Sequence, residues 1–373
     1  MTARSKLFRQ FNSKDELRRK LMELYYTRRL SQREIAGIFG VCQTRISQFF
    51  KEFGLIARNK SEAASLAKSK GRYRSFDPEK DEELAVQLNA LIHTDFYKEK
   101  WRRKIRIRTA TTHLGMIIFL DKLAKNHDLP AVKCEPRLSY KNNKPLRFQK
   151  AHDYEWTIKL PLDESFNQIL EDSDKSGYVE RLSRFRKELF PIYFTRAVEC
   201  DGSIVLTKKR SKITGKVGIY SKDYQHLLSI KKAINEVLRL PTILSNPDRR
   251  DKCANLYMLL TNPKVMDFFE EEMNFTHPEK MWMKELALKY VGEYAKLEIL
   301  EEIRNVNRTI KRLTNIMIQL AKERLSLPRG RRVIQSDDLI KLALQRFFEC
   351  RLDNDKTTQD FTELLRRLGV CIS

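Results

Sequence analysis

LNALIHTDF (residues 88–96) and FTRAVECDG (residues 194–202) are the two stretches that decide the fold of this chain. Each is an apolar run with helical spacing that finishes in a carboxylate, Asp95 in the first and Asp201 in the second. We expect each stretch to form a helix that ends at its aspartate. The two copies lie about a hundred residues apart, which suggests a duplicated structural unit.

The same order of elements follows both stretches. Alternating strand residues come first, then an amphipathic helix, a second strand region and another helix. The amphipathic helix lies near residues 116–125 in the first copy and runs from about residue 222 to 238 in the second. The sequence therefore predicts one α+β unit used twice, at residues 81–180 and 181–290.

With this order, the two stretches resemble the LAGLIDADG homing endonucleases in their single-chain, two-motif form, over roughly residues 81–290. The resemblance implies two pseudo-symmetric αββαββα repeats whose antiparallel sheets form a saddle for DNA and whose motif helices pack side by side. It also implies that Asp95 and Asp201, the penultimate acidic residues of the motifs, bind the catalytic divalent metal. Lysines near the metal are typical of the family, and Lys175 and Lys280, each following a repeat's last helix, are the candidates.

Paired carboxylates also suit phosphodiester cleavage on physical grounds. A divalent ion neutralises the charge of the transition state and supplies hydroxide near neutral pH. Hard oxygen ligands with an incomplete shell suit Mg²⁺. A carboxylate at a helix C-terminus is otherwise poorly placed, because the helix macrodipole repels it. For Asp201, which precedes Gly202, ordinary turn chemistry is the alternative.

Two residues depart from the family pattern. The first motif has Phe96 where the family usually has glycine, and the second has Arg196 where close helix contact usually wants a small residue. Small side chains remain at Ala90, Thr94 and Cys200. Phe96 and Arg196 therefore bear on how tightly the motif helices pack.

The first repeat carries an alternating basic strand. Lys104, Arg106 and Arg108 alternate with Ile105 and Ile107, so the cations should face away from the core, toward DNA. Few acidic residues accompany this run, which favours DNA contact over a merely solvated face.

A basic hairpin is predicted at the equivalent place in the second repeat. We expect its turn at Thr214–Gly215, with Val217 and Ile219 pointing inward. Its candidate DNA contacts are Lys208, Lys209, Lys212, Lys216 and Tyr220. A solvated surface is again the alternative.

Residues 1–57 form a predicted N-terminal domain of three short helices. Ser31 and Glu34 form a capping box, Gly40 ends that helix, and another helix runs on to about Phe53. This segment resembles the helix-turn-helix superfamily, whose second helix enters the major groove. The side chains it would present to DNA are Gln43, Thr44, Arg45 and Gln48. A domain used for protein contact is the alternative.

Two further regions have simpler interpretations. Residues 58–80 are basic and poor in large aliphatic residues, so we interpret them as a linker that can lie on phosphates. Residues 291–373 carry apolar residues at helical spacing and should pack as a helical pair against the repeats.

The composition fits a polyanionic partner. Lys plus Arg number 73 against 49 Asp plus Glu, giving a net charge of +24, and nucleic acid is the commonest partner for such an excess. No apolar run could span a bilayer or act as a signal segment, so we expect a cytoplasmic, DNA-associated protein with no membrane partner. The six cysteines and six histidines form no catalytic or metal-binding spacing, so any catalysis should fall to carboxylates.

The predicted function is a site-specific double-strand DNA endonuclease of the homing type, acting as a monomer with Mg²⁺. The chain lacks the residues expected of an intein, which favours a free-standing or intron-encoded enzyme. Two alternatives use the same fold: a non-catalytic DNA-binding transcriptional regulator, and a maturase that binds intron RNA.

Overall fold

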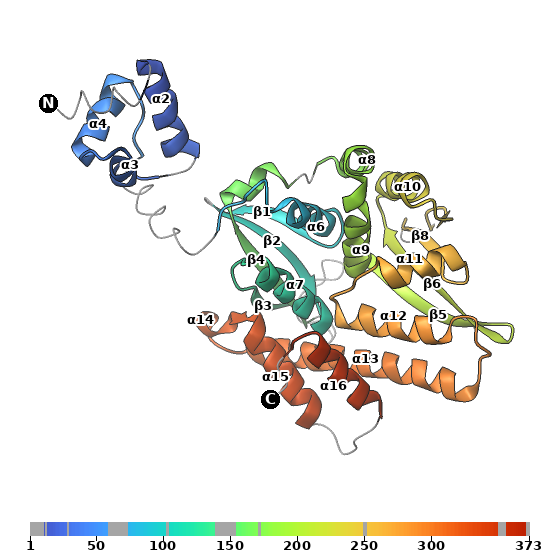
Figure 1. Ribbon diagram of the computed structural model, residues 1–373. Coiled ribbons are helices and arrows are strands. Elements are labelled where there is room, and N and C mark those ends of the chain that lie inside the picture. The colour runs from blue at the N-terminus through green and yellow to red at the C-terminus, as the bar shows by residue number, and fades with distance from the viewer. Residues whose placement is uncertain are drawn as a thin grey trace. The chain divides into compact units, whose positions relative to one another are not determined.

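The computed structural model describes residues 11, 13–27, 30–58, 74–101, 104–138, 154–170, 173–248, 252–349 and 356–370. The chain divides between residues 72 and 73 into an N-terminal unit and a larger body. Most of the predicted linker, residues 59–73, lies outside the described residues. Figure 1 labels the elements of both units.

The N-terminal unit contains the three expected helices: α2 (Lys14–Met22), α3 (Gln32–Phe39) and α4 (Gln43–Glu52). They enclose a small core that includes Leu17, Leu21, Ile35, Ile46 and Phe49. The predicted capping box is present. Ser31 Oγ accepts from the Glu34 amide at 3.2 Å, and Glu34 Oε2 accepts from the Ser31 amide at 2.7 Å. Gly40 ends α3 in the left-handed region, with φ of +62°, which glycine adopts without strain.

The body contains the two predicted repeats. The first comprises α6 (Glu82–His93), β1 (Tyr97–Trp101), β2 (Lys104–Thr111), α7 (Leu114–Asn126), β3 (Lys133–Leu138), β4 (Tyr154–Asp163) and α8 (Lys175–Phe185). The second comprises α9 (Phe190–Asp201), β5 (Gly202–Lys209), β6 (Lys212–Ser221), α10 (Tyr224–Ala233), β7 (Ile243–Leu244), β8 (Ala254–Leu259), α11 (Pro263–Glu271) and α12 (Pro278–Tyr290). Both sheets are antiparallel, with strand orders β1-β2-β4-β3-β9, where β9 (Ile334–Gln335) comes from the C-terminal region, and β5-β6-β8-β7. The predicted α+β architecture is therefore confirmed.

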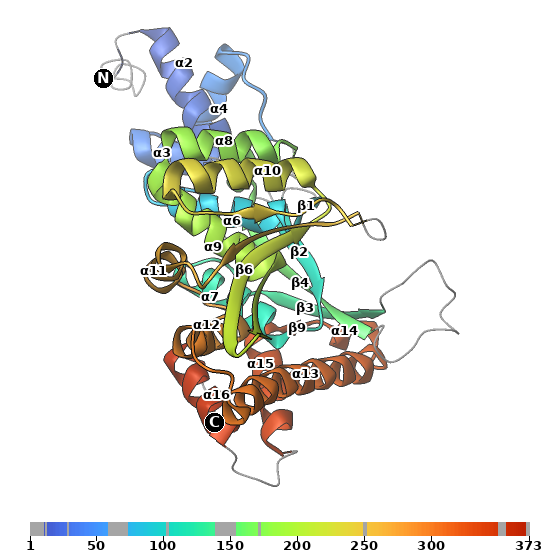
Figure 2. The same ribbon diagram turned by 90° about the vertical axis from the view of Figure 1, so that its right-hand side faces the viewer.

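Helices α6 and α9 lie side by side between the two sheets (Figures 1 and 2). Both are apolar on most of their circumference because each packs against the other helix and against strands. Ala90 on α6 and Ala197 on α9 are fully buried, as close helix packing requires. One hydrophobic core runs through both repeats and into the C-terminal region.

The body begins earlier than predicted. The Arg74 guanidinium, assigned above to the linker, donates to both carboxylate oxygens of Asp81, with Nη2 and Oδ1 2.8 Å apart. Its Nε also donates to the His127 carbonyl at 2.6 Å. Arg74 is therefore held by the first repeat and is not a linker cation available to phosphates.

The C-terminal region is more elaborate than the predicted helical pair. It contains α13 (Leu297–Leu325), the short α14 (Arg329–Arg332), β9 (Ile334–Gln335), α15 (Ser336–Glu349) and α16 (Lys356–Arg367). Strand β9 pairs with β3 at the edge of the first sheet, and the Trp156 indole donates to the Met317 carbonyl of α13 at 2.9 Å. A two-residue strand has no periodicity, so the sequence could not reveal it. Within the described ranges, no helix has the length and apolar character needed to cross a membrane.

Candidate active site and nucleic-acid interface

Asp95 and Asp201 meet where the two motif helices end. Their carboxyl groups lie within hydrogen-bonding reach of each other, although the residues are far apart in sequence. Burial, together with the hydrogen bond and the charge of Asp95, raises the pKa of Asp201 from 3.8 to about 8, against the opposing charges of Lys175 and Lys280. Without a bound cation, Asp201 therefore keeps its proton at neutral pH. The sequence-based pairing of these two aspartates agrees with this geometry.

The two motifs do not end in the same way. Helix α9 includes Asp201, whereas α6 stops at His93 and leaves Asp95 in the following turn. In this turn the Thr94 hydroxyl donates to the Ala90 carbonyl at 2.8 Å, and the Phe96 side chain is buried in the core. The prediction that the first helix ends at Asp95 is therefore wrong, because α6 stops at His93. The burial of Phe96 accounts for this early end.

Gly202 permits the tighter ending of the second motif. A Cβ at this position would lie 2.5 Å from Val198 Cα and 2.7 Å from the Gly218 carbonyl oxygen of β6. No side chain fits between the end of α9 and that strand. The glycine is therefore required by close backbone approach, in addition to any turn chemistry of Asp201.

Lys175 and Lys280 occupy matching places beside the two aspartates. Lys175 begins α8, and its Nζ donates to the His93 carbonyl at 2.9 Å. Lys280 lies in the first turn of α12, and its Nζ donates to the Gly202 carbonyl. The prediction that each lysine follows a repeat's last helix is therefore wrong. Each lysine lies in the first turn of that helix. Burial lowers the pKa of Lys280, and the neighbouring acids oppose that shift.

Arg196 joins the motif helices and does not separate them. Its guanidinium donates to the carboxylate of Glu199, one turn along α9, and its Nε donates to Gln87 Oε1 of α6 at 2.9 Å. Glu199 has no exposed surface, and it also accepts from the amides of Thr276 and His277, the latter at 2.8 Å. These amides precede α12, so Glu199 fixes the start of the helix that carries Lys280.

Glu199 is the important residue that sequence analysis missed. Side chains three residues apart lie on the same face of a helix, so the spacing of Arg196 and Glu199 could have indicated their ion pair. The partners Gln87, Thr276 and His277 come from distant parts of the chain, and no local pattern predicts them.

A neutral network occupies the corresponding place beside α6. The Tyr193 hydroxyl lies 2.8 Å from His93 Nδ1 and 2.8 Å from His226 Nε2, and all three side chains are buried. Burial lowers the pKa of His226 to about 3. His226 is therefore uncharged at neutral pH.

Among the described residues, the candidate metal donors are the two aspartates. The part of the chain that the structure describes holds no group of three or more His, Cys, Asp or Glu side chains placed to bind a metal ion. Two close carboxyl groups, one of which holds its proton because of burial and of its neighbour, are nevertheless a donor set that a divalent cation fits, because the cation would replace that proton and balance the charge of both groups. Mg²⁺ commonly binds through one or two carboxylates and keeps several waters.

The first sheet turns its predicted cations outward. Ile105 and Ile107 are fully buried, and Arg106 and Arg108 lie half-buried on the other face. The side chain of Lys104 lies outside the described residues. The expectation that few acids accompany these cations is wrong in space: Glu99, on the neighbouring strand β1, lies 3.4 Å from Arg108 Nε.

The second sheet also agrees with the predicted alternation, with one correction. Val217 and Ile219 are buried, while Lys209, Lys212 and Tyr220 are exposed and Lys216 is half-buried. The hairpin turns at residues 210–211 and not at Thr214–Gly215, because Arg210 adopts the left-handed conformation with φ of +57°.

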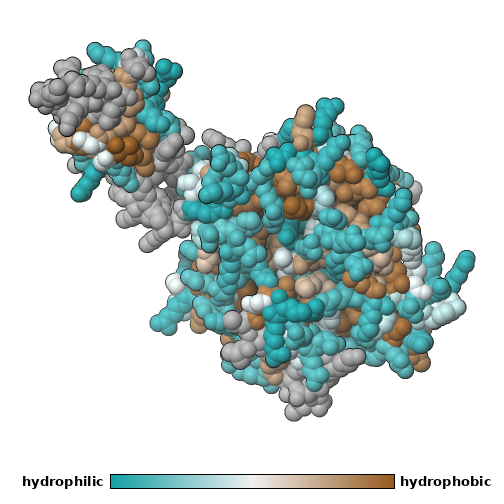
Figure 3. All heavy atoms as spheres, in the orientation of Figure 1, coloured by the Kyte–Doolittle hydropathy of each residue, from teal (hydrophilic) through white to brown (hydrophobic). Residues whose placement is uncertain are grey.

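Gly215 lies inside β6. A Cβ there would meet Leu260 and Val291 side chains at 2.9 Å, so the glycine serves packing. Lys208 alternates with Lys209 and therefore points to the opposite side of the hairpin. Figure 3 shows the projecting end of this hairpin, beside β5 and β6 in Figure 1, in hydrophilic and neutral colours.

The predicted DNA-reading side chains of α4 gather on one exposed surface of the N-terminal unit. Gln43, Thr44 and Gln48 are exposed and Arg45 is half-buried. Arg45 Nη1 donates to Gln48 Oε1 at 2.7 Å, and the guanidinium lies 4.6 Å from the centre of the Phe49 ring. The two residues best able to read bases are thus held together.

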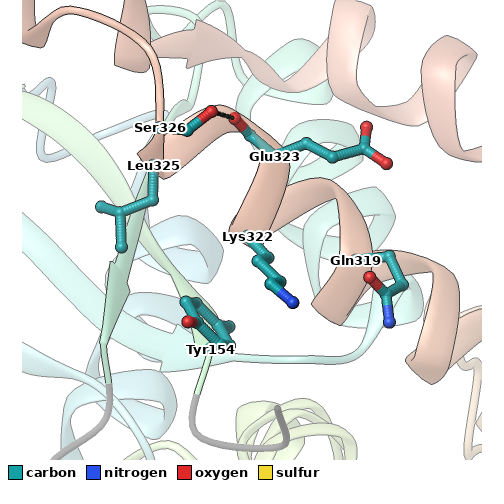
Figure 4. Close-up of a pocket in the computed structure, with 6 residues that line it drawn as sticks. All are labelled: Tyr154, Gln319, Lys322, Glu323, Leu325 and Ser326. Atoms are coloured by element: carbon teal, nitrogen blue, oxygen red, sulfur yellow. Dashed lines mark hydrogen bonds between the residues drawn. The ribbon is translucent and has the colours of Figure 1, made fainter. Parts of the chain in front are cut away.

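A hollow of about 570 Å³ lies elsewhere in the body, between the start of β4 and the end of α13 (Figure 4). Its lining residues are Tyr154, Gln319, Lys322, Glu323, Leu325 and Ser326. None of the predicted site residues is among them.

Comparisons with known proteins give structural matches only. No family profile and no curated protein matches the sequence. The homing endonuclease I-DmoI in complex with DNA and Ca is 13% identical over 51% of this chain and 88% of that chain, with a TM-score of 0.32. The LAGLIDADG homing endonuclease I-GzeII in complex with its DNA target is 8% identical over 60% of this chain and 97% of that chain, with a TM-score of 0.35.

Full-length DUF199/WhiA from Thermatoga maritima is 17% identical over 80% of this chain and 98% of that chain, with a TM-score of 0.35. This chain is similar to all three in fold. The predicted pair of α+β repeats with their motif helices packed together is present in the structure.

Proposed function

We propose that this chain is a metal-dependent, site-specific double-strand DNA endonuclease of the homing type. One observation carries the proposal. The carboxyl groups of Asp95 and Asp201 come from corresponding ends of two duplicated helices and lie within hydrogen-bonding reach, and this proximity contributes to the raised pKa of Asp201. Carboxyl groups held together in this way are costly to an apo protein and suited to binding a divalent cation.

Asp95 and Asp201 would hold the metal, with Mg²⁺ as the preferred ion because both donors are hard oxygens. When bound, the ion supplies charge neutralisation at the phosphate and a hydroxide near neutral pH. Lys175 and Lys280 add two positive charges beside the carboxyl groups and steady the backbone at the motif ends. These charges favour a phosphate at this place.

DNA binding rests on the cationic surfaces of both units. The outward residues Arg106, Arg108, Lys209, Lys212, Lys216 and Tyr220 of the two sheets form the proposed interface of the body. In the N-terminal unit, Gln43, Thr44, Arg45 and Gln48 at the start of α4 would contact base edges in the major groove. Because both motifs belong to one chain, we propose that the protein acts as a monomer on an asymmetric double-stranded site.

A cleavage assay with Mg²⁺ tests the proposal. Its substrate is DNA of the locus that encodes the chain, from which the coding insertion has been removed. We expect double-strand cleavage by the wild-type protein and none by Asp95→Asn or Asp201→Asn, with DNA binding retained by both variants. Preference for the intron transcript over DNA would support a maturase and contradict the proposal.

A non-catalytic DNA-binding regulator is the second candidate. The observation in its favour is that the ammonium groups of Lys175 and Lys280 are both engaged by backbone carbonyls beside a carboxyl group that holds its proton. Tight DNA binding without cleavage in Mg²⁺ or Mn²⁺ would support this candidate.

A further inference from the structure

The two sheets of the body present outer faces of different electrostatic character. We define the first face by the outward residues of β1, β2, β4 and β3, which include Glu99, Arg106, Arg108, Lys133, Glu135, Arg137, Glu155 and Lys159. We define the second face by the outward residues of β5, β6 and β8, which include Ser203, Val205, Thr207, Lys209, Lys212, Thr214, Lys216, Tyr220, Asn255, Tyr257 and Leu259. Both faces carry cations, but only the first carries acids among these positions.

Cations of the first face are occupied by acids of neighbouring strands. Arg137 Nη2 lies 2.7 Å from Glu155 Oε1, and Arg108 Nε lies 3.4 Å from Glu99 Oε2. Lys159 pairs with Glu135 on β3. The strand register places each of these acids on the same side of the sheet as its cation.

Among the described residues, the cations of the second face have no such acidic partners. Within the described ranges, no ion pair involves Lys209, Lys212 or Lys216. Two of these ammonium groups lie near aromatic rings instead: Lys212 Nζ is 5.6 Å from the Tyr294 ring centre, and Lys216 Nζ is 5.1 Å from that of Tyr257. An aromatic neighbour leaves the positive charge uncompensated, so it remains available to a phosphate.

We infer that the two faces bind the two halves of a DNA site by different forces, and this inference rests on the proposed function. The second face neutralises phosphates and supplies most of the salt dependence of binding by the body. On the first face a phosphate bound at Arg108, Arg137 or Lys159 must compete with a carboxylate, so neutralisation contributes little at these positions. Paired Arg and Glu side chains can instead satisfy guanine and cytosine edges, which makes the first face the reader of base sequence.

Salt dependence of binding by the full chain tests the inference. The affinity for a duplex of about 30 base pairs is measured by fluorescence anisotropy between about 50 and 200 mM KCl, with Ca²⁺ in place of Mg²⁺. Each lost phosphate contact reduces the slope of log K against log salt by about 0.9. Contacts of the N-terminal unit are common to all variants and cancel in the comparison.

Three variants are compared with the wild-type protein. Lys209→Gln/Lys212→Gln/Lys216→Gln should reduce the slope by about 2 to 3, whereas Arg108→Gln/Arg137→Gln/Lys159→Gln should reduce it by less than about 1. The third, Glu99→Gln/Glu135→Gln/Glu155→Gln, frees the cations of the first face and should make the slope steeper. Circular dichroism and thermal unfolding check that each variant is folded.

The inference would be overturned if the triple variant of the second face and the cation triple variant of the first face reduced the slope equally. A slope unchanged by the loss of the three acids would overturn it as well. Either result would leave DNA binding itself intact. Failure of the wild-type protein to bind DNA at all would instead overturn the proposed function, and the inference with it.

Discussion

The polar groups that flank the two motif helices are unlike, although the helices themselves are related by duplication. Beside the end of α9, Glu199 is buried as a charged partner of Arg196 and of two backbone amides. At the matching position of α6 stands His93, in a network with Tyr193 and His226 that carries no charge on His226 at neutral pH. The duplication has preserved the backbone and the aspartates, while the supports beside them have diverged.

This difference teaches that the two halves of the site are not interchangeable. One lysine, Lys280, extends from a helix whose start is fixed by a buried ion pair, and the other, Lys175, donates to the carbonyl of a residue in a neutral hydrogen-bond network. Damage to the charged support should therefore cost more than damage to the neutral one, and loss of the shared aspartates should cost function but not stability.

The largest effect is expected from the residues that the two halves share. Asp95→Asn or Asp201→Asn should reduce the cleavage rate by at least about a thousandfold, or roughly 4 kcal/mol in the barrier. Neither change should lower the thermal unfolding temperature in metal-free buffer, because each removes the cost of holding Asp201 protonated above its ordinary pKa. Rates from single-turnover cleavage and unfolding curves are the measurements. A variant that cleaves at the wild-type rate would show that its aspartate is dispensable.

Removing the cation of the charged support should have the next largest effect. Arg196→Met leaves the buried Glu199 without its cation, and we expect the free energy of unfolding to fall by about 3 to 5 kcal/mol. Arg196→Met/Glu199→Gln removes both charges and should recover part of this loss. Urea unfolding of both variants measures it. No recovery in the double variant would mean that the ion pair is not the source of the cost.

The neutral support should be less sensitive. Tyr193→Phe removes the hydroxyl that bonds both His93 and His226, and we expect a loss of about 1 to 3 kcal/mol. Tyr294→Phe, at a ring that is 63% exposed, is the matched control and should change little. If Tyr193→Phe proved as costly as Arg196→Met, the proposed difference between the supports would be wrong.

The sequence was sufficient for the features that repeat or alternate. Two apolar runs that finish in Asp95 and Asp201 predicted the duplicated helices, and the Ile105 and Ile107 alternation predicted which side of β2 faces the core. Local periodicity carries this information directly. The roles of the two aspartates stay a prediction.

Features that depend on strand register or on distant partners could not be predicted. The acids Glu99, Glu135 and Glu155 reach cations of the first face only because β1 pairs with β2, and β3 with β4, in the observed registers. Arg196 looked obstructive from its size alone, and its partner Gln87 lies on the other motif helix. The early end of α6 reflects the burial of Phe96, which is a tertiary effect.

The pKa of Asp201 links metal binding to pH with a definite sign. Because the folded-state pKa of about 8 lies above the ordinary value of 3.8, the contribution of Asp201 to the stability of the metal-free protein is greatest in acid and is lost as the pH rises from about 4 through 8. A metal that binds both aspartates displaces the proton, so its stabilising effect should grow over the same range.

Proton release on Mn²⁺ binding therefore tests the shared carboxyl site most directly. Titration calorimetry at pH 7, repeated in buffers of different ionisation enthalpy, counts the protons. We predict release of about one proton per chain from the wild-type protein and none from Asp201→Asn, whose Mn²⁺ affinity should also fall. Equal Mn²⁺ binding by the wild-type protein and by Asp95→Asn/Asp201→Asn, with no proton released, would contradict the account.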